Sequence, residues 1–155
     1  MLIGYTSGVF DLFHIGHLNI LKNAKRMCDK LVVGVSVDDW VLEYKGKKPL
    51  IPFADRLEIV KSIRYVDAVI PQENMDKLTI CQTVGAEIMF MGDDKRNDPA
   101  WMEIKRVLGL HGIKTVFFPY TKDISTTLIS EAFDDDRSVL AKIKNAGYKL
   151  NGGCK

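Results

Sequence analysis

Short, strongly apolar runs recur along the chain and are separated by longer stretches of mixed polarity. The five runs that we expect to form strands span residues 2–6, 31–37, 67–70, 87–91 and 115–118. The run at 31–37 is too apolar to be half exposed, which is typical of a strand covered on both faces. The pattern therefore predicts a parallel sheet between two layers of helices.

The stretches between these runs carry apolar residues at helical spacing. Residues 18–28 and 57–63 place apolar side chains three and four positions apart on one face. Asp98 before Pro99 is typical of a helix start, and we expect that helix over residues 100–110. Strands and helices thus alternate, and this order predicts a doubly wound α/β fold with a parallel five-stranded sheet.

A chain of 155 residues fits one domain with one core. No linker or repeat interrupts residues 1–133, so we expect the domain to span them. Residues 134–155 contain an acidic run, a short basic amphipathic piece and a glycine-rich tip. We therefore expect them to form a C-terminal appendage that is partly helical or flexible.

Composition and charge argue against several classes of protein. The net charge of +2 is too small to indicate a nucleic-acid surface. No apolar run approaches the ~20 residues of a membrane span, and no basic leader typical of a signal peptide precedes the first run. Cys28, Cys81 and Cys154 are widely spaced, which is typical of reduced thiols. We expect a cytoplasmic protein that binds neither nucleic acid nor membranes.

Four polar or glycine-rich segments follow the expected strands, at residues 7–17, 38–49, 91–98 and 120–127. Ligands of an open parallel sheet bind beyond the carboxyl ends of its strands. We therefore expect these segments to build one site at that edge.

The first segment contains the motif H-x-G-H, formed by His14, Gly16 and His17. We expect a helix to begin near these histidines, and its free N–H groups and positive dipole end would favour an anion. Gly16 would keep the turn between the two imidazoles open. A zinc pair more often uses four-residue spacing with a glutamate between, so phosphate fits better than metal. Taken alone, the motif has an equally good structural explanation. In that explanation one histidine caps the helix or packs in the core, and the other is exposed.

The other segments carry further groups that suit phosphate. Lys45 and Lys47 crowd a glycine-containing loop and would neutralise phosphates, although such charge runs are usually solvated surface. Ser125 and Thr126 stand at the start of the last expected helix and would cradle a phosphate, although an ordinary N-cap needs only one hydroxyl. Asp94 would hold a ribose, a base amino group or Mg²⁺ through water, unless it serves a turn or a cap.

Arg64 lies between an expected helix and a short strand. A guanidinium there would grip a phosphate in a bidentate fork. The alternative is a structural ion pair with Asp67.

Together these segments resemble the cytidylyltransferase branch of the H-x-G-H nucleotidyltransferase superfamily, and most of all the small bacterial glycerol-3-phosphate cytidylyltransferases. The pieces that carry the resemblance are GVFDLFHIGH, KGKKP, RYVDAVIP, MGDD and ISTT, in that family's order and at similar spacing. The resemblance covers about residues 1–133 and implies a Rossmann-like nucleotidyltransferase fold.

The resemblance implies transfer of CMP from CTP to a small phosphate monoester, glycerol 3-phosphate first, with release of pyrophosphate. It also implies Mg²⁺ with the triphosphate and a homodimer. The alternatives are another acceptor (phosphoethanolamine, phosphocholine, a sugar phosphate or another phosphorylated metabolite), ATP in place of CTP, or a non-catalytic nucleotide-binding module. Two positions depart from the family pattern: Tyr120 stands where an arginine is usual, and Lys95 stands where an aromatic residue is expected.

By position in the motifs, the resemblance implies a role for individual residues. The residues expected to act in catalysis are His14, His17, Lys45, Lys47 and Arg64. The residues expected to bind the nucleotide are Gly8, Val9, Phe10, Asp11, Gly16, Asp94, Ser125 and Thr126. The residues expected to bind the acceptor are Asp38, Lys45 and Arg64. No protein side chain is expected to ligate a metal directly.

Overall fold

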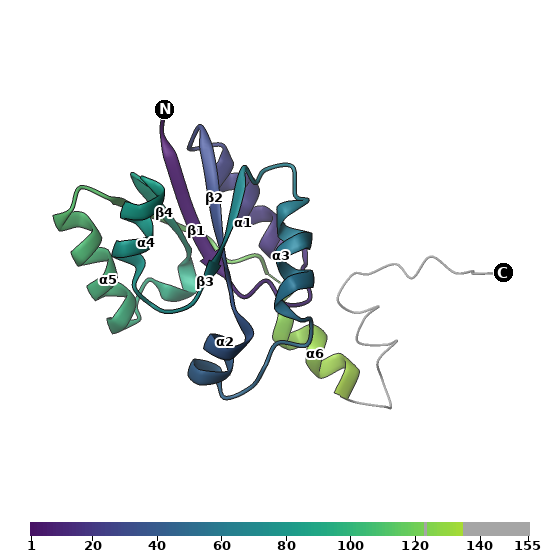
Figure 1. Cartoon of the computed structure of the whole chain (residues 1–155). Helices are drawn as coiled ribbons and strands as arrows, with labels where there is room; N and C mark the ends of the chain where they lie inside the picture. The colour runs from purple at the N-terminus through teal and green to yellow at the C-terminus, as the bar shows by residue number, and fades with distance from the viewer. Residues whose placement is uncertain (123, 135–155) are drawn as a thin grey trace.

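All five expected strands form, and they pair into one parallel sheet (Figure 1). The computed structural model describes residues 1–122 and 124–134. The strands are β1 (Ile3–Gly8), β2 (Lys30–Ser36), β3 (Ala68–Gln72), β4 (Ile88–Gly92) and β5 (Lys114–Phe118). Each boundary lies within about two residues of its prediction, because buried apolar runs are strong strand signals.

The sheet order is β3-β2-β1-β4-β5, which confirms the predicted doubly wound fold. Every pair of neighbouring strands is parallel, and Gly8 at the end of β1 lies beside Val35 near the end of β2. The carboxyl ends of the strands therefore share one edge. The chain reverses its direction of winding between β1 and β4, and this is where such folds bind ligands.

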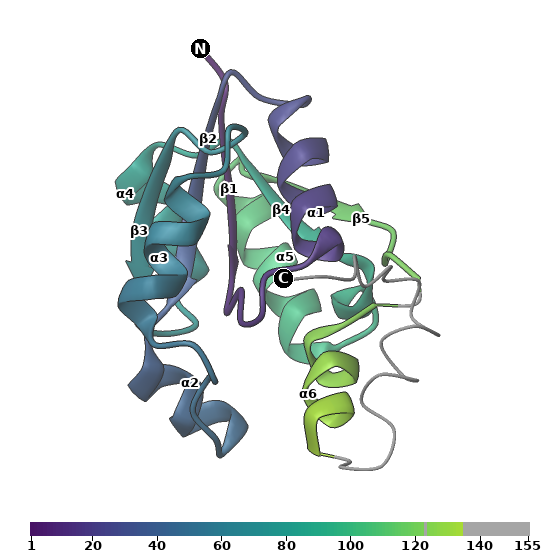
Figure 2. The same ribbon diagram turned by 90° about the vertical axis from the view of Figure 1, so that its right-hand side faces the viewer.

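Helices cover both faces of the sheet (Figure 2). The helices are α1 (Ile15–Lys25), α2 (Asp38–Lys45), α3 (Phe53–Lys61), α4 (Lys77–Val84), α5 (Pro99–Leu110) and α6 (Thr126–Asp134), with a short 3₁₀ turn at Asp93–Lys95. One core cluster joins α1 and α3 to the sheet, and a second cluster joins α4 and α5 to the other face. In Figure 2, α2 and α6 project below the carboxyl ends of the strands, on either side of the loop that follows β1.

Helix α2 was not expected, because residues 38–49 were interpreted as a polar loop. Asp38 and Asp39 occupy the first turn of α2, where the helix dipole stabilises negative charge. Val41 of the same helix is buried. Gly46 ends the helix at φ 72°, a conformation that glycine adopts without a steric penalty. Two helices thus stand between β2 and β3 where one was predicted. Helix α5 begins at Pro99 with Asp98 as its N-cap, as predicted.

A glycine in β2 makes room for a polar contact across the sheet. The Tyr5 hydroxyl reaches over Gly34 and donates a hydrogen bond to the Gln72 side chain of β3. A Cβ at Gly34 would overlap the Tyr5 hydroxyl. Burial raises the pKa of Tyr5, so the hydroxyl keeps its proton and remains a donor.

Within residues 1–122 and 124–134, no helix is long and apolar enough to cross a bilayer. The expected appendage lies outside the described residues except for Asp134, which ends α6. Its structure therefore stays a prediction.

Candidate active site

The loop from β1 to α1 is strained. Phe10 has φ 55° and Leu12 has φ 47°, in the left-handed region that non-glycine residues rarely adopt. Each such residue costs roughly 1–3 kcal/mol unless its surroundings hold it. The Phe10 ring is buried, and its centroid lies 6.3 Å from that of Phe13 and 5.3 Å from that of His17. The core therefore holds one side of the loop in place.

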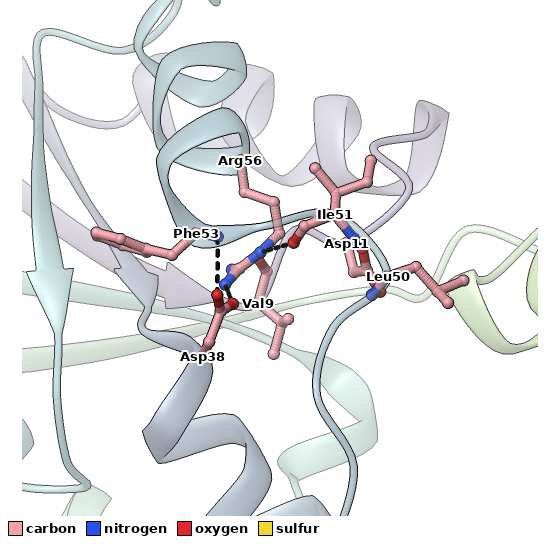
Figure 3. A network of polar contacts seen from close by, with 7 residues as sticks. All are labelled: Val9, Asp11, Asp38, Leu50, Ile51, Phe53 and Arg56. Carbon is pink, nitrogen blue, oxygen red and sulfur yellow. Dashed lines mark hydrogen bonds and ion pairs between the residues drawn. The ribbon is translucent and has the colours of Figure 1, made fainter.

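Arg56 of α3 holds the same loop by hydrogen bonds (Figure 3). Its side chain is fully buried. Nη1 donates to the Val9 carbonyl at 2.6 Å, and Nε donates to the Ile51 carbonyl at 2.8 Å. Nη2 donates to Asp38 Oδ1 at 2.7 Å, and the Phe53 N–H donates to Asp38 Oδ2 at 3.2 Å. One planar guanidinium thus joins the loop after β1, the start of α2 and the segment before α3.

Asp11 makes a second connection between segments that are distant in sequence. Its carboxylate accepts hydrogen bonds from the N–H groups of Leu50, at 2.8 Å, and Ile51, at 3.0 Å. Its backbone carbonyl accepts from the Thr126 hydroxyl at 2.7 Å. Asp11 was predicted to bind nucleotide, but both carboxylate oxygens already have partners. These bonds hold the segment between α2 and α3, and the start of α6, against the loop after β1, and nucleotide binding by Asp11 stays a prediction.

His14 and His17 lie together at the start of α1, as predicted. Their rings stack with centroids 3.9 Å apart. His14 is the N-cap, and its Nδ1 accepts from the Gly16 N–H at 3.0 Å. His17 Nδ1 accepts from the His14 N–H at 3.3 Å. Since both Nδ1 atoms act as acceptors, both neutral rings carry their proton on Nε2, which leaves two N–H donors for a ligand.

Gly16 leaves space beside the His14 ring, in line with the open turn that we expected, and its nucleotide binding stays a prediction. It lies inside α1, and a Cβ at this position would stand 2.8 Å from Cε1 and 2.9 Å from Nδ1 of His14. The missing side chain makes room for the His14 ring over the first turn. The glycine of the motif is therefore required by histidine packing.

Both histidines are held in the neutral form. Burial lowers the pKa of His14 below its usual value. Burial, then the charges of His14 and Lys45, lowers the pKa of His17 to about 3. Both imidazoles are thus uncharged donors at neutral pH.

Lys45 belongs to the same electrostatic cluster, but it stands at the end of α2 and not on a loop. Burial, followed by the charges of Lys95 and Lys47, lowers its pKa, while Asp11 and Asp94 act in the opposite direction. Three segments thus place charged groups close enough to Lys45 to affect its protonation. This cationic edge suits a highly charged anion such as a polyphosphate.

The structure brings Ser125 and Thr126 to the same edge through the contact with Asp11. The Ser125 hydroxyl accepts from the Leu128 N–H at 3.0 Å, which is the contact of an ordinary N-cap. Asp94 pairs with Lys95 at 3.1 Å. Gly8 lies at the end of β1, where a Cβ would come within 3.3 Å of the Phe10 ring.

Arg64 does not join this group within the chain. It precedes β3, whose first residue pairs with Val32 of β2, so Arg64 lies toward the amino ends of the strands. Its Nη2 donates to the Tyr65 hydroxyl at 2.8 Å. The alternative ion pair with Asp67 does not form among the described residues, because the Asp67 carboxylate pairs with Lys25 at 2.7 Å.

Asp38 was predicted to bind the acceptor, yet its two oxygens bond Arg56 and the Phe53 N–H. Burial alone would raise the pKa of Asp38, but these hydrogen bonds hold it below its usual value. Arg56 itself was not predicted as a site residue. The available signal was its position four residues before Val60, on the buried face of a predicted helix.

The sheet is parallel, and groups that suit phosphate, which are hydrogen-bond donors and lysines, lie at its carboxyl edge near the point where the winding reverses. This combination is typical of a nucleotide-binding α/β protein. A family model described as Cytidylyltransferase-like matches residues 5–132. The chain belongs to this family, as its motifs predicted.

Several relatives with known names match most of the chain. It is 36% identical to the glycerol-3-phosphate cytidylyltransferase of Bacillus subtilis over 127 residues, covering 81% of this chain and 92% of that protein. It is also 36% identical to an FAD synthase of Pyrococcus abyssi over 115 residues, covering 73% of this chain and 77% of the relative. The bifunctional protein HldE of Gluconacetobacter diazotrophicus is 35% identical, over 62% of this chain but only 20% of HldE.

The fold also matches solved structures. The lipopolysaccharide core biosynthesis protein of Thermoplasma volcanium superposes with a TM-score of 0.65 at 30% identity, covering 79% of this chain and 98% of that one. This likeness confirms the α/β nucleotidyltransferase-like fold.

The role of Arg56 can be tested by removing its donors. We expect Arg56→Met to lower the free energy of unfolding by about 3 kcal/mol, because Asp38 and the carbonyls of Val9 and Ile51 lose their partner. Urea denaturation measures this value. The matched control is Arg106→Met, which breaks an exposed pair with Glu103 and should cost less than about 1 kcal/mol. Equal losses of stability in the two variants would contradict a structural role for the buried Arg56 guanidinium.

The neutral state of His17 predicts a pH dependence of stability. A histidine whose pKa is lowered by folding binds more protons in the unfolded chain, so stability falls as pH drops below the unfolded value near 6.5. We expect wild type to lose roughly 1–2 kcal/mol more than His17→Asn between pH 7 and pH 5. Urea denaturation at the two pH values gives this difference. Parallel curves for the two proteins would show that folding leaves the imidazole pKa unchanged.

Proposed function

We propose that this protein is a nucleotidyltransferase that transfers CMP from CTP to a small phosphate monoester and releases pyrophosphate. The first acceptor to consider is glycerol 3-phosphate. The observation that carries the proposal is the pair of imidazoles whose Nε2–H groups are left as donors beside Lys45. The similarity to a glycerol-3-phosphate cytidylyltransferase supports this choice of nucleotide and acceptor.

The chemistry requires no covalent enzyme intermediate. A phosphate oxygen of the acceptor attacks the α-phosphorus of the triphosphate, and the bond from that phosphorus to the bridging α–β oxygen breaks. The electron pair leaves with pyrophosphate. The acceptor phosphate is already ionised, so no strong base is needed and catalysis rests on in-line positioning and charge stabilisation.

In this scheme the histidines donate hydrogen bonds to the triphosphate and follow the negative charge that develops on the leaving group. Lys45 and Lys47 neutralise the α-phosphate and the acceptor phosphate. The start of α6, with Ser125 and Thr126, binds the β/γ end through backbone N–H groups and the remaining hydroxyl capacity. Arg64 does not belong to this set within one chain, because it lies toward the amino ends of the strands.

We propose that Mg²⁺ arrives with the triphosphate. Among the described residues, no group of three or more His, Cys, Asp or Glu side chains would hold a metal by itself. Mg²⁺ commonly combines one or two carboxylates with waters and substrate phosphates, and Asp94 offers such a carboxylate with its side chain 49% exposed. When bound, the ion would neutralise charge on the phosphates.

A second candidate is the same reaction with ATP or with another acceptor. Lys95 and Tyr120 depart from the family pattern near the expected nucleotide position, and Tyr120 is 58% exposed. FAD, the product in the name of other relatives, contains an adenine nucleotide. As part of the same proposal, the enzyme is cytoplasmic, as its widely spaced cysteines suggest, and a homodimer, as the family resemblance suggests.

The activity can be tested with a matrix of substrates. Purified protein with Mg²⁺ is incubated with CTP or ATP and with glycerol 3-phosphate, phosphoethanolamine, phosphocholine or a sugar phosphate. We expect pyrophosphate release with CTP and a product whose mass equals the acceptor plus CMP less water. Release with ATP alone would overturn the cytidylyl assignment. Absence of release with every pair would overturn the proposed activity.

The donor role of His14 can be separated from its role as a helix cap. Asparagine keeps an acceptor near the position of Nδ1 but lacks an Nε2 donor, and it is a favourable N-cap. We expect His14→Asn to lower kcat about 10²–10³-fold while the melting temperature changes little. His111→Asn, on an exposed histidine at the end of α5, is the control and should leave kcat unchanged. Turnover of His14→Asn near the wild-type rate would exclude His14 as a catalytic donor.

A further inference from the structure

Lys77 is a buried cation that the proposed reaction does not use. It is the first residue of α4, directly after the turn that follows β3, and it is 4% exposed. Its Nζ donates to the Ser7 hydroxyl at 3.0 Å and lies 5.7 Å from the centre of the Trp101 ring. Lysine usually keeps its ammonium in water, so this burial calls for an explanation.

The ammonium lacks an anionic partner in the structure. No carboxylate of the described residues lies within ion-pair distance of Lys77 Nζ, and only one of its three N–H donors has a hydrogen-bond acceptor. The Trp101 ring offsets part of the desolvation cost, since a cation near an aromatic face is stabilised. A buried charge is normally paired, and an anionic oxygen would complete this environment.

The position of Lys77 connects it to the candidate active site. Ser7 is followed by Gly8 and the strained loop that leads to the histidines. Because Ser7 is two residues from Tyr5, both side chains point to the α4/α5 face of β1. Lys95 lies 5.9 Å from the same Trp101 ring centre.

Lys95 also links this place to the phosphate-binding edge, because its charge lowers the pKa of Lys45. Lys95 therefore connects Lys45, whose pKa it lowers, with the Trp101 ring that Lys77 also contacts. Ser7, which accepts from Lys77, stands one residue before the end of β1, so Lys77 lies next to the edge at which the reacting phosphate is expected.

We propose that Lys77, with Ser7 and Trp101, binds a second anionic group of the acceptor, a carboxylate or a phosphate. The preferred acceptor is then a phosphate monoester that carries another negative charge. This inference rests on the proposed function for the identity of the reacting phosphate.

Two acceptors with the same carbon skeleton test this directly. Glycerol 3-phosphate ends in a hydroxymethyl group, and 3-phosphoglycerate ends in a carboxylate. We expect wild type to have a kcat/KM at least about tenfold higher for 3-phosphoglycerate. Lys77→Met should raise the KM for 3-phosphoglycerate roughly 30-fold or more and leave the KM for CTP within about twofold.

The matched control is Lys105→Met. Lys105 is an exposed lysine of α5, and its Nζ lies 5.6 Å from the centre of the Phe117 ring. This variant should keep the preference for 3-phosphoglycerate. If Lys77→Met instead raises the KM for CTP, or affects both acceptors equally, Lys77 does not bind the second anion and the proposal is overturned.

Calorimetric binding separates this inference from the proposed function. Each acceptor is titrated into wild type and Lys77→Met with a non-reactive α,β-methylene analogue of CTP present. Tighter binding of 3-phosphoglycerate that is lost in Lys77→Met supports the Lys77 subsite even if no turnover is found. Equal binding of both acceptors by wild type overturns the subsite, whatever the outcome for pyrophosphate release.

If Lys77→Met fails to fold, the pH dependence of wild type supplies the test. Burial lowers the pKa of Lys77 to about 8. The groups facing it are Cys81 on α4, whose pKa burial raises to about 11, Tyr5 on β1, whose pKa burial also raises, and Lys95 across the Trp101 ring. Binding of 3-phosphoglycerate should therefore weaken relative to glycerol 3-phosphate between pH 7 and pH 9. A constant ratio of the two affinities would overturn the proposal.

Discussion

The candidate site depends on one fully buried guanidinium. Arg56 bonds the Val9 carbonyl, the Ile51 carbonyl and Asp38, and these three acceptors belong to three separate segments of the chain. Apolar packing alone would leave those polar groups without partners, at a cost of roughly 1–3 kcal/mol each. The loop after β1, the lysine-bearing end of α2 and the segment before α3 are therefore held in one arrangement before any ligand binds.

That arrangement permits backbone conformations that a free loop would abandon. Phe10 and Leu12 keep positive φ angles because the Phe10 ring is packed in the core and the neighbouring Val9 and Asp11 are hydrogen-bonded. The loop thereby places the start of α1, with its two histidines, at the carboxyl edge. Preorganisation of this kind suits a reaction that depends on positioning, since no group has to be ordered as charge develops.

Features governed by local pattern could be predicted from the sequence. The strands follow from buried apolar runs, the start of α5 follows from Asp98 and Pro99, and the histidine pair follows from its spacing. The burial of Lys77 and the partners of Arg56 could not be recognised, because the local sign for Arg56, its place on the apolar face of α3, does not identify the groups that it bonds. Their surroundings come from contacts across 47 residues, for Arg56 and Val9, and 70 residues, for Lys77 and Ser7. Arg64 was found by its motif, but the motif does not say at which edge of the sheet the residue lies.

The bonds at the start of α1 make the two proposed imidazole donors part of the helix end itself. The His14 and Gly16 amide hydrogens are the same hydrogens that hold the two Nδ1 atoms. Fraying of this single turn would release both rings at once, although the rest of the sheet stays folded. The exchange rate of those two amides with solvent is therefore a direct gauge of how often both rings are held in place.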